Sequence, residues 1–277
     1  MIVLKIFRFE FDRMLRSKSM WLSLAIAIAI VTTDFAECIR LYNQGIDTER
    51  SVFYKWLGVN CEYYTGRYLF MSLPLITSIG YSWSVCHDRC CGYINQIITR
   101  INRFKYFAAK FLVSFISGGI IFSAALIVHF MLLATVFPNY EPIPGDLNSF
   151  MNPFRFCSDI FYQNTYLFML IWILTAFTWG GAMSGISLLS GMYIKKSTLT
   201  PIIPFIIFTC QQIISGYIMQ KYRILLKGMN LSIAWNDMLF ASSEVRNPQD
   251  IVWGNIVIII IITAIFYIIR GRKYECL

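Results

Sequence analysis

The chain is poor in charged residues and contains almost no histidine. Only 14% of its 277 residues are Asp, Glu, Lys or Arg, whereas a typical soluble domain carries about a quarter. So little polar surface excludes an ordinary water-soluble protein. The two histidines, His87 and His129, leave few side chains for acid-base or metal chemistry.

The sequence also lacks a nucleotide-binding motif. Residues 191–197 resemble a phosphate loop only loosely, because Lys195 stands where that motif has a glycine before its lysine. We therefore expect no catalytic residues and no cofactor bound by this chain. If the protein moves a molecule uphill, the energy must come from a partner.

The eight cysteines do not define a site. Cys61 and Cys157 are expected on the same, outer side, where they could form a disulfide or remain free thiols. His87, Cys90 and Cys91 are close in sequence, but a structural zinc site needs four ligands and nothing nearby completes the set. We expect no bound metal.

Long apolar segments are what the sequence does contain. Hydrophobic residues make up 57% of the chain, and a bilayer core of about 30 Å is crossed by roughly 20 of them in a helix. Six transmembrane helices are predicted, at residues 20–41, 67–87, 107–137, 163–194, 199–220 and 250–270. Residues 1–277 thus predict a single all-α integral membrane domain, in a lipid membrane.

The charges predict the orientation of this domain. With the N-terminus in the cytoplasm, the inner segments are residues 1–19, 88–110, 195–198 and 270–277, and they hold 15 of the 24 Lys and Arg but 4 of the 15 Asp and Glu. This positive-inside pattern places both termini in the cytoplasm of a cell whose plasma membrane the chain crosses. It does not resemble the basic face of a soluble nucleic-acid binder, so no nucleic acid is expected as a partner.

Residues 1–18 predict a helix that lies in the membrane interface. Phe7 and Phe11 recur at helical spacing on an apolar face, and the segment carries basic residues that include Arg13 and Arg16. The alternative is an ordinary charged flank that orients the first span.

Residues 91–103 predict a second short amphipathic helix, on the cytoplasmic surface. Its apolar positions follow the i, i+3, i+4, i+7 spacing of about three helical turns, and they are Ile94, Ile97, Ile98 and Ile101. Arg100 and Arg103 occupy another face. Because the apolar face is aliphatic, without Trp or Phe, it is more typical of a protein contact than of a lipid contact.

Several polar or small residues within the spans could line a pathway or pack helices together. They are His129, Gly181, Gly185, Gln211 and Gln212. Small residues four apart let helices approach closely, and polar side chains at this depth are expected to face the protein interior. Outside the spans, residues 138–162 contain four prolines and predict an irregular outer loop, and residues 221–249 predict short helices at the outer leaflet.

Two stretches resemble ABC type-2 transporter permeases. The order Asp88, Gly92, Arg100, Arg103, Tyr106, Lys110 between the second and third spans resembles the coupling-helix region of that family. The N-terminal residues Glu10, Arg16, Ser17, Lys18 and Trp21 resemble the helix that leads into its first span. One departure is His87-Asp88-Arg89-Cys90-Cys91, where the family usually has a Glu-rich segment before the glycine.

The resemblance implies a permease subunit that dimerises with an identical or related chain. Its coupling helix would contact separate cytoplasmic ABC ATPase subunits, which would bind ATP and Mg²⁺. The contact residues would be Asp88, Gly92, Ile94, Ile97, Ile98, Arg100, Ile101 and Arg103. The implied activity is export of an amphipathic or lipid-like cargo, such as a peptide or antibiotic.

Two other functions stay open at this point. One is an outer-face binding or immunity protein that acts without transport, and the other is an intramembrane enzyme that uses His129. A carrier driven by protons or sodium is disfavoured, because it needs ionisable groups at mid-membrane and the central portions of the spans have almost none apart from His129.

Overall fold

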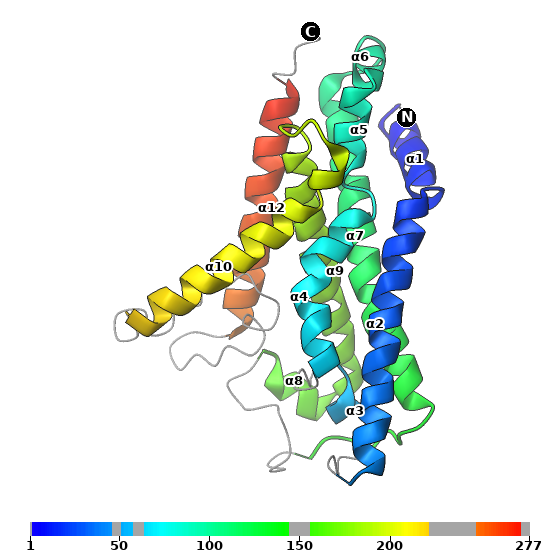
Figure 1. The fold of residues 1–277 in the computed structure, drawn as a ribbon, viewed down its shortest axis with the longest axis vertical. Helices are drawn as coiled ribbons and strands as arrows, with labels where there is room; N and C mark the ends of the chain where they lie inside the picture. Colours follow the sequence, from blue (N-terminus) through cyan, green and yellow to red (C-terminus); the bar gives the residue numbers. More distant parts are fainter. Residues whose placement is uncertain (1, 46–50, 58–63, 144–155, 222–247, 273–277) are drawn as a thin grey trace.

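The computed structural model describes residues 2–45, 51–57, 64–143, 156–221 and 248–272 (Figure 1). Within these ranges the regular structure is entirely helical. The helices are α1 (Ile2–Leu15), α2 (Lys18–Asn43), α3 (Val52–Lys55), α4 (Tyr64–Ile79), α5 (Ser84–Cys90), α6 (Tyr93–Ile98), α7 (Arg103–Ala134), α8 (Ser158–Gln163), α9 (Thr165–Ser190), the 3₁₀ turn η1 (Ser197–Leu199), α10 (Ile202–Lys221) and α12 (Pro248–Arg272). Six segments are long and apolar enough to cross a membrane, which confirms the all-α, multi-pass prediction.

Five of the predicted spans agree with α2, α7, α9, α10 and α12 to within a few residues. The second span is different, because the predicted continuous helix over residues 67–87 is interrupted. It consists of α4 and α5, which are separated by a turn at residues 80–83. The hydroxyl of Ser19 in α2 donates to the Gly80 carbonyl (2.8 Å) and accepts from the Trp83 indole N–H (2.9 Å). A side chain of the first span thus supplies hydrogen bonds at the interruption.

The centre of the bundle is the close pair α7 and α9. Gly118 and Gly180 face each other so closely that a Cβ at Gly118 would lie 2.4 Å from the Gly180 carbonyl oxygen. The Ser114 and Ser184 hydroxyls are 2.8 Å apart across the same contact. Small residues and hydroxyls therefore bring these two helices together, as expected where water exclusion cannot drive association.

Gly181 and Gly185 belong to this packing. A Cβ at Gly181 would lie 2.7 Å from the ring of Phe115, and one at Gly185 would lie 3.3 Å from the ring of Phe111. Of the two roles that the sequence left open for these glycines, their described surroundings match helix packing.

Short elements close the bundle at the end opposite to the termini (Figure 1). Residues 51–57, which include α3, are buried throughout. The Val52 amide donates to the Pro138 carbonyl (3.2 Å), and the Ser51 hydroxyl donates to the Tyr140 carbonyl (2.7 Å). The prediction of an irregular loop over residues 138–162 is partly wrong, since it includes α8, and residues 222–247 lie outside the described ranges.

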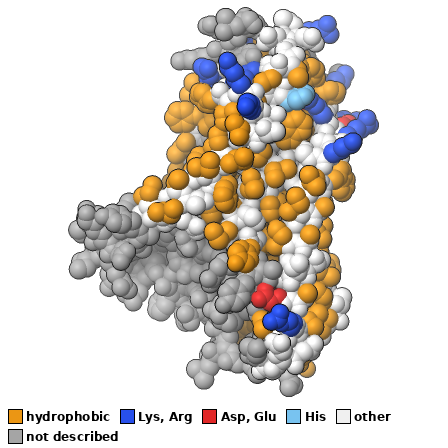
Figure 2. All heavy atoms as spheres, viewed as in Figure 1, with side chains coloured by type: hydrophobic (Ala, Val, Ile, Leu, Met, Phe, Trp, Pro, Cys, Tyr) orange, Lys and Arg blue, Asp and Glu red, His pale blue; other side chains and the backbone are white. Residues whose placement is uncertain are grey.

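The visible surface has the layout of a membrane protein. Figure 2 shows hydrophobic side chains over the middle of the molecule and Lys and Arg gathered at the end that carries both termini. On α12 the side chains of Ile258, Ile262 and Phe266 are about half exposed, which suits contact with lipid tails. In Figure 1, α10 leans away from the other spans.

Gly118→Ala is expected to lower the temperature of unfolding, because its methyl group would collide with the backbone of Gly180. Overpacking of this kind costs about 1–3 kcal/mol. Gly254→Ala is the matched control, since a methyl group there meets no described atom within 4 Å and alanine favours a helix by up to about 1 kcal/mol. Thermal unfolding in detergent measures both variants, and equal shifts would contradict the packing role of Gly118.

Candidate functional site

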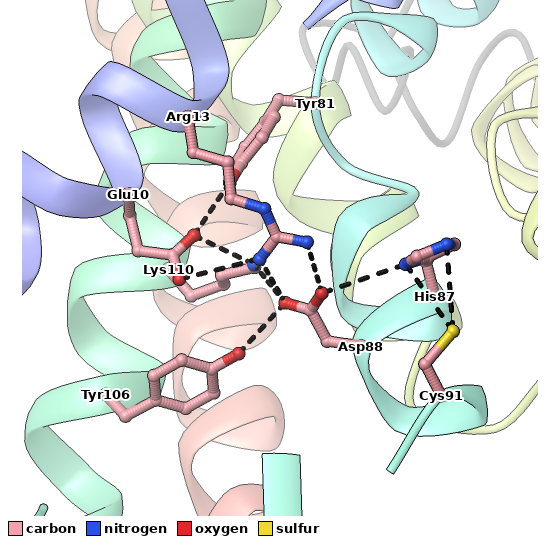
Figure 3. A network of polar contacts seen from close by, with 8 residues as sticks. All are labelled: Glu10, Arg13, Tyr81, His87, Asp88, Cys91, Tyr106 and Lys110. Atoms are coloured by element: carbon pink, nitrogen blue, oxygen red, sulfur yellow. Dashed lines mark hydrogen bonds and ion pairs between the residues drawn. The ribbon is translucent and has the colours of Figure 1, made fainter. Parts of the chain in front are cut away.

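A buried cluster of charged side chains joins three elements at the end of the bundle that carries the termini (Figure 3). Helix α1 contributes Glu10 and Arg13, α5 contributes Asp88, and α7 contributes Lys110. We call these four residues the ionic cluster. It lies beside α6, the helix that the sequence singled out as functional.

Arg13 and Asp88 form a two-pronged ion pair. The two terminal nitrogens of Arg13 donate to the two carboxylate oxygens of Asp88 at 2.9 and 2.5 Å. Parallel hydrogen bonds of this kind fix orientation as well as distance. The pair therefore sets the position of α1 relative to α5.

Lys110 lies between the two carboxylates. Its Nζ is 2.8 Å from Glu10 Oε2 and 2.5 Å from Asp88 Oδ2, and its side chain is fully buried. Tyr81 donates from its hydroxyl to Glu10 (2.7 Å), and Tyr106 donates to Asp88 (3.1 Å). The two anions thus face two cations and two phenols, and the formal charge of the cluster sums to zero.

The ionic cluster shifts the pKa of its own member Arg13 and that of the neighbouring Tyr93, and both groups lie outside the spans. Partial burial on its own would lower the pKa of Arg13, but the hydrogen bonds and charge of Asp88 outweigh it and raise that pKa above its ordinary value. The guanidinium also lies over the ring of Tyr93, 5.3 Å from its centroid. Burial, followed by the charge of Glu10, raises the pKa of Tyr93. Both groups keep their neutral-pH protonation state over the physiological range.

Helix α6 is shorter than predicted. It spans Tyr93–Ile98 in place of the three turns expected over residues 91–103. It begins at Gly92, whose φ of 70° is a left-handed conformation that favours glycine. It ends in a turn before Asn102, whose side chain accepts from the Phe104 amide and starts α7. The segment predicted as one helix over residues 91–103 therefore consists of α6 and a turn, after which α7 begins at Arg103.

The isoleucines of this region face the protein's own interior. Ile94 is fully buried, and Ile97, Ile98 and Ile101 are partly buried against a cluster that includes Ile6, Val85 and Phe107. The exposed polar and basic side chains are those of Gln96, Thr99, Arg100, Asn102 and Arg103, and Cys91 and Phe104 are exposed at either end of the segment. A partner on this surface would meet mainly polar and basic groups, while Asp88 and Ile94 are buried.

The N-terminal helix turns more of its surface inward than predicted. Ile6, Glu10 and Met14 are buried against the bundle, and Phe7 and Phe11 are partly buried, with ring centroids 5.9 Å apart. Arg16 is exposed. The amphipathic helix itself agrees with the sequence, and its location in the membrane interface stays a prediction.

The remaining candidates fall in other parts of the molecule. His129 is fully buried, and its Nε2 lies 3.2 Å from Asp34 Oδ2. It faces the protein interior, where Asp34 of α2 lies beside it. Gln211 and Gln212 are half-buried on α10.

Cys157 and His87, two further candidates from the sequence, lie outside the Asp34–His129 pair. Cys157 is a free thiol, and burial together with the charge of Asp159 raises its pKa to about 11; Cys61 lies outside the described ranges. His87 is half-exposed, and its ring contacts Cys91 at 3.7 Å.

Sequence reasoning named Glu10, Asp88 and Lys110 only as parts of a resemblance and did not predict that they meet. Glu10 and Lys110 are far apart along the chain, and no helical periodicity links them. The available signal was the presence of two acids within basic, apolar segments, since such acids must find cations when they are buried.

Lys110→Met is expected to destabilise the protein by about 3–5 kcal/mol, because it leaves two buried carboxylates with one cation. Lys110→Met combined with Glu10→Gln leaves one anion, Asp88, paired with one cation, Arg13. This double variant is expected to recover part of the lost stability. Lys5→Met, on the exposed side of α1, is the control. Thermal unfolding in detergent compares the four proteins, and a double variant no more stable than Lys110→Met alone would contradict charge balance as the cause.

Comparison with known proteins adds no relative. No protein-family model, no curated protein and no solved structure matches this chain.

Proposed function

We propose that this chain is the membrane-spanning subunit of an ATP-driven exporter and that it resembles ABC type-2 permeases in mechanism. The exposed edge of the α6 region, with Arg100 and Arg103, would contact a separate cytoplasmic ATPase. That ATPase would bind ATP and Mg²⁺, and a second permease subunit would complete the pathway. The cargo class that suits an apolar bundle is an amphipathic or lipid-like molecule.

The observation that carries this proposal is the attachment of α6 to the bundle. Its isoleucines pack on α5 and α7 residues, and Asp88, at the end of α5, is held by Arg13 and Lys110. A force applied to the exposed basic edge would therefore pass into α1, α5 and α7 together. This is the mechanical property that a motor contact requires.

An external energy source is supported by one feature of the sequence. The sequence has no phosphate loop, which supports a separate ATPase. The lack of ionisable groups in the spans no longer supports it, because Asp34 and His129 form a buried pair. The alternative of a binding or immunity protein that acts without transport predicts a fully active chain with no ATPase partner.

The test is purification of the full-length, tagged chain from its native membranes in mild detergent. A phosphate-loop ATPase is expected to co-purify, and the reconstituted complex is expected to hydrolyse ATP faster when its cargo is added. Full activity of the chain in cells without any such ATPase would overturn the proposal.

Arg100→Glu is expected to weaken the association with the ATPase about tenfold or more. The proposed contact pairs Arg100 with an acidic group of the ATPase, and placing a second negative charge opposite that group costs more than 1.4 kcal/mol. Lys196→Glu is the matched control, because it reverses an equally exposed charge on the turn after α9, outside the α6 region. Co-purified ATPase per permease is the measurement. An equal loss in both variants would indicate a general effect of charge and would contradict a specific contact at α6.

A further inference from the structure

A second ionisable pair lies deep in the bundle, away from the ionic cluster. Asp34 is on α2, roughly 24 Å along the helix from Lys18 at 1.5 Å per residue, and His129 is on α7. Both side chains are fully buried. His129 Nε2 is 3.2 Å from Asp34 Oδ2. A buried carboxylate is costly unless a positive or donor group faces it.

The other ring nitrogen of His129 holds a different segment. The amide N–H of Leu57 donates to His129 Nδ1 at 3.2 Å. One residue earlier, the Trp56 indole N–H donates to the Leu126 carbonyl of the same helix at 3.0 Å. Two hydrogen bonds thus connect residues 51–57 to α7, and the imidazole accepts one of them.

These contacts specify where the imidazole proton is. Because Nδ1 accepts a hydrogen bond, it carries no proton, so the neutral ring carries its proton on Nε2, toward Asp34. A second proton would have to bind Nδ1, where it would face the N–H of Leu57. Two donors cannot share a hydrogen bond, and the contact would open.

A carboxylate, the group that pairs with an imidazolium, faces the other side of the ring. Among the described residues, neither oxygen of Asp34 nor Nε2 of His129 has a well-formed hydrogen bond. The backbone of Gly66, on α4, lies close to the carboxylate, because a Cβ at this position would be 3.1 Å from Asp34 Oδ1. Other charged side chains of the described residues toward this end are Glu37 and Arg40 on α2, and Lys55, which lies over the rings of Tyr42 and Phe137.

The thiol of Cys38, on α2, also faces the pair, and the three side chains lie within 4.8 Å of one another. Such a trio could suggest a metal. Coordination by Nε2 would move the ring proton to Nδ1, opposite the Leu57 amide, so the observed contact fits a proton better than a metal.

We propose that Asp34 and His129 form a proton-binding site that controls one hydrogen bond between residues 51–57 and α7, that of Leu57. With a neutral ring, Leu57 is held. When a proton from water binds Nδ1, Asp34 and the imidazolium form a full ion pair, and Leu57 is released to another acceptor such as water. The inference does not depend on an ATPase or on the nature of any cargo.

The test uses the small number of histidines. The full-length chain, labelled with ¹⁵N in its two histidine rings and placed in lipid nanodiscs, is observed by NMR as the pH is lowered. His87→Gln removes the other signal, because His87 is half-exposed and outside the pair. We expect the neutral ring of His129 to be the Nε2–H form, as the Leu57 contact requires, and any imidazolium signal to appear together with the loss of that contact. Hydrogen exchange of the Leu57 amide, corrected for intrinsic pH dependence, is expected to lose its protection over the same pH interval.

Two variants separate the roles of the pair. Asp34→Asn removes the carboxylate beside Nε2, so the release of Leu57 is expected to be smaller at the pH where the unchanged chain shows it. His129→Asn keeps an acceptor near Leu57 but cannot gain a proton, so protection of the Leu57 amide is expected not to depend on pH. The NMR measurement without changes in the pair decides the question even if these variants fold poorly.

Three results would overturn the proposal. The ring could be the Nδ1–H form at neutral pH, which contradicts the Leu57 contact. It could stay neutral while the Leu57 amide loses protection, which separates the two events. Added Zn²⁺ could shift the Nε2 signal at neutral pH, which would identify a metal site in place of a proton site.

Discussion

The burial of the Lys110 ammonium between Glu10 and Asp88 is the constraint on which the basic end of the bundle depends. An ammonium away from water is unstable unless anions and hydrogen-bond acceptors surround it. Helix α7 therefore requires α1 to bring Glu10 and α5 to bring Asp88, and Arg13 balances the second anion. Since α6 follows α5 directly, its position is fixed by the same charges.

The middle of the bundle is held by a different kind of contact. Helices α7 and α9 approach through Gly118 and Gly180, and hydroxyl groups connect neighbouring helices, as between Ser82 and Ser187 at 2.6 Å. In lipid these contacts replace water exclusion as the source of specificity. The molecule thus has an apolar centre between two polar ends, with the ionic cluster at one end and the Asp34–His129 pair toward the other.

Much of this architecture could be predicted from the sequence, because hydropathy reports on length and lipid contact. That signal identified the spans to within a few residues, apart from the interruption after Ile79. It could not find α3, which has four residues, or α8, which lies in a proline-rich segment. Elements this short make no hydropathy signal of their own, and their burial depends on neighbours distant in sequence.

The candidate site was harder to predict for a related reason. The isoleucine spacing over residues 94–101 correctly indicated an amphipathic segment, but periodicity gives the apolar face and not the surface it contacts. Likewise, the sequence contains Asp34 and His129 without any pattern that joins them. Only the crossing of α2 and α7 brings them within 3.2 Å.

The interruption of the second span has a mechanical consequence. A continuous helix would carry an axial displacement from the basic end to the opposite end as a stiff rod. The turn at residues 80–83 separates α5 from α4, so the two helices are not one continuous rod. A displacement of α5 would instead travel sideways, through Asp88 into α1 and α7, and would reach the far end along the uninterrupted length of α7, which carries His129.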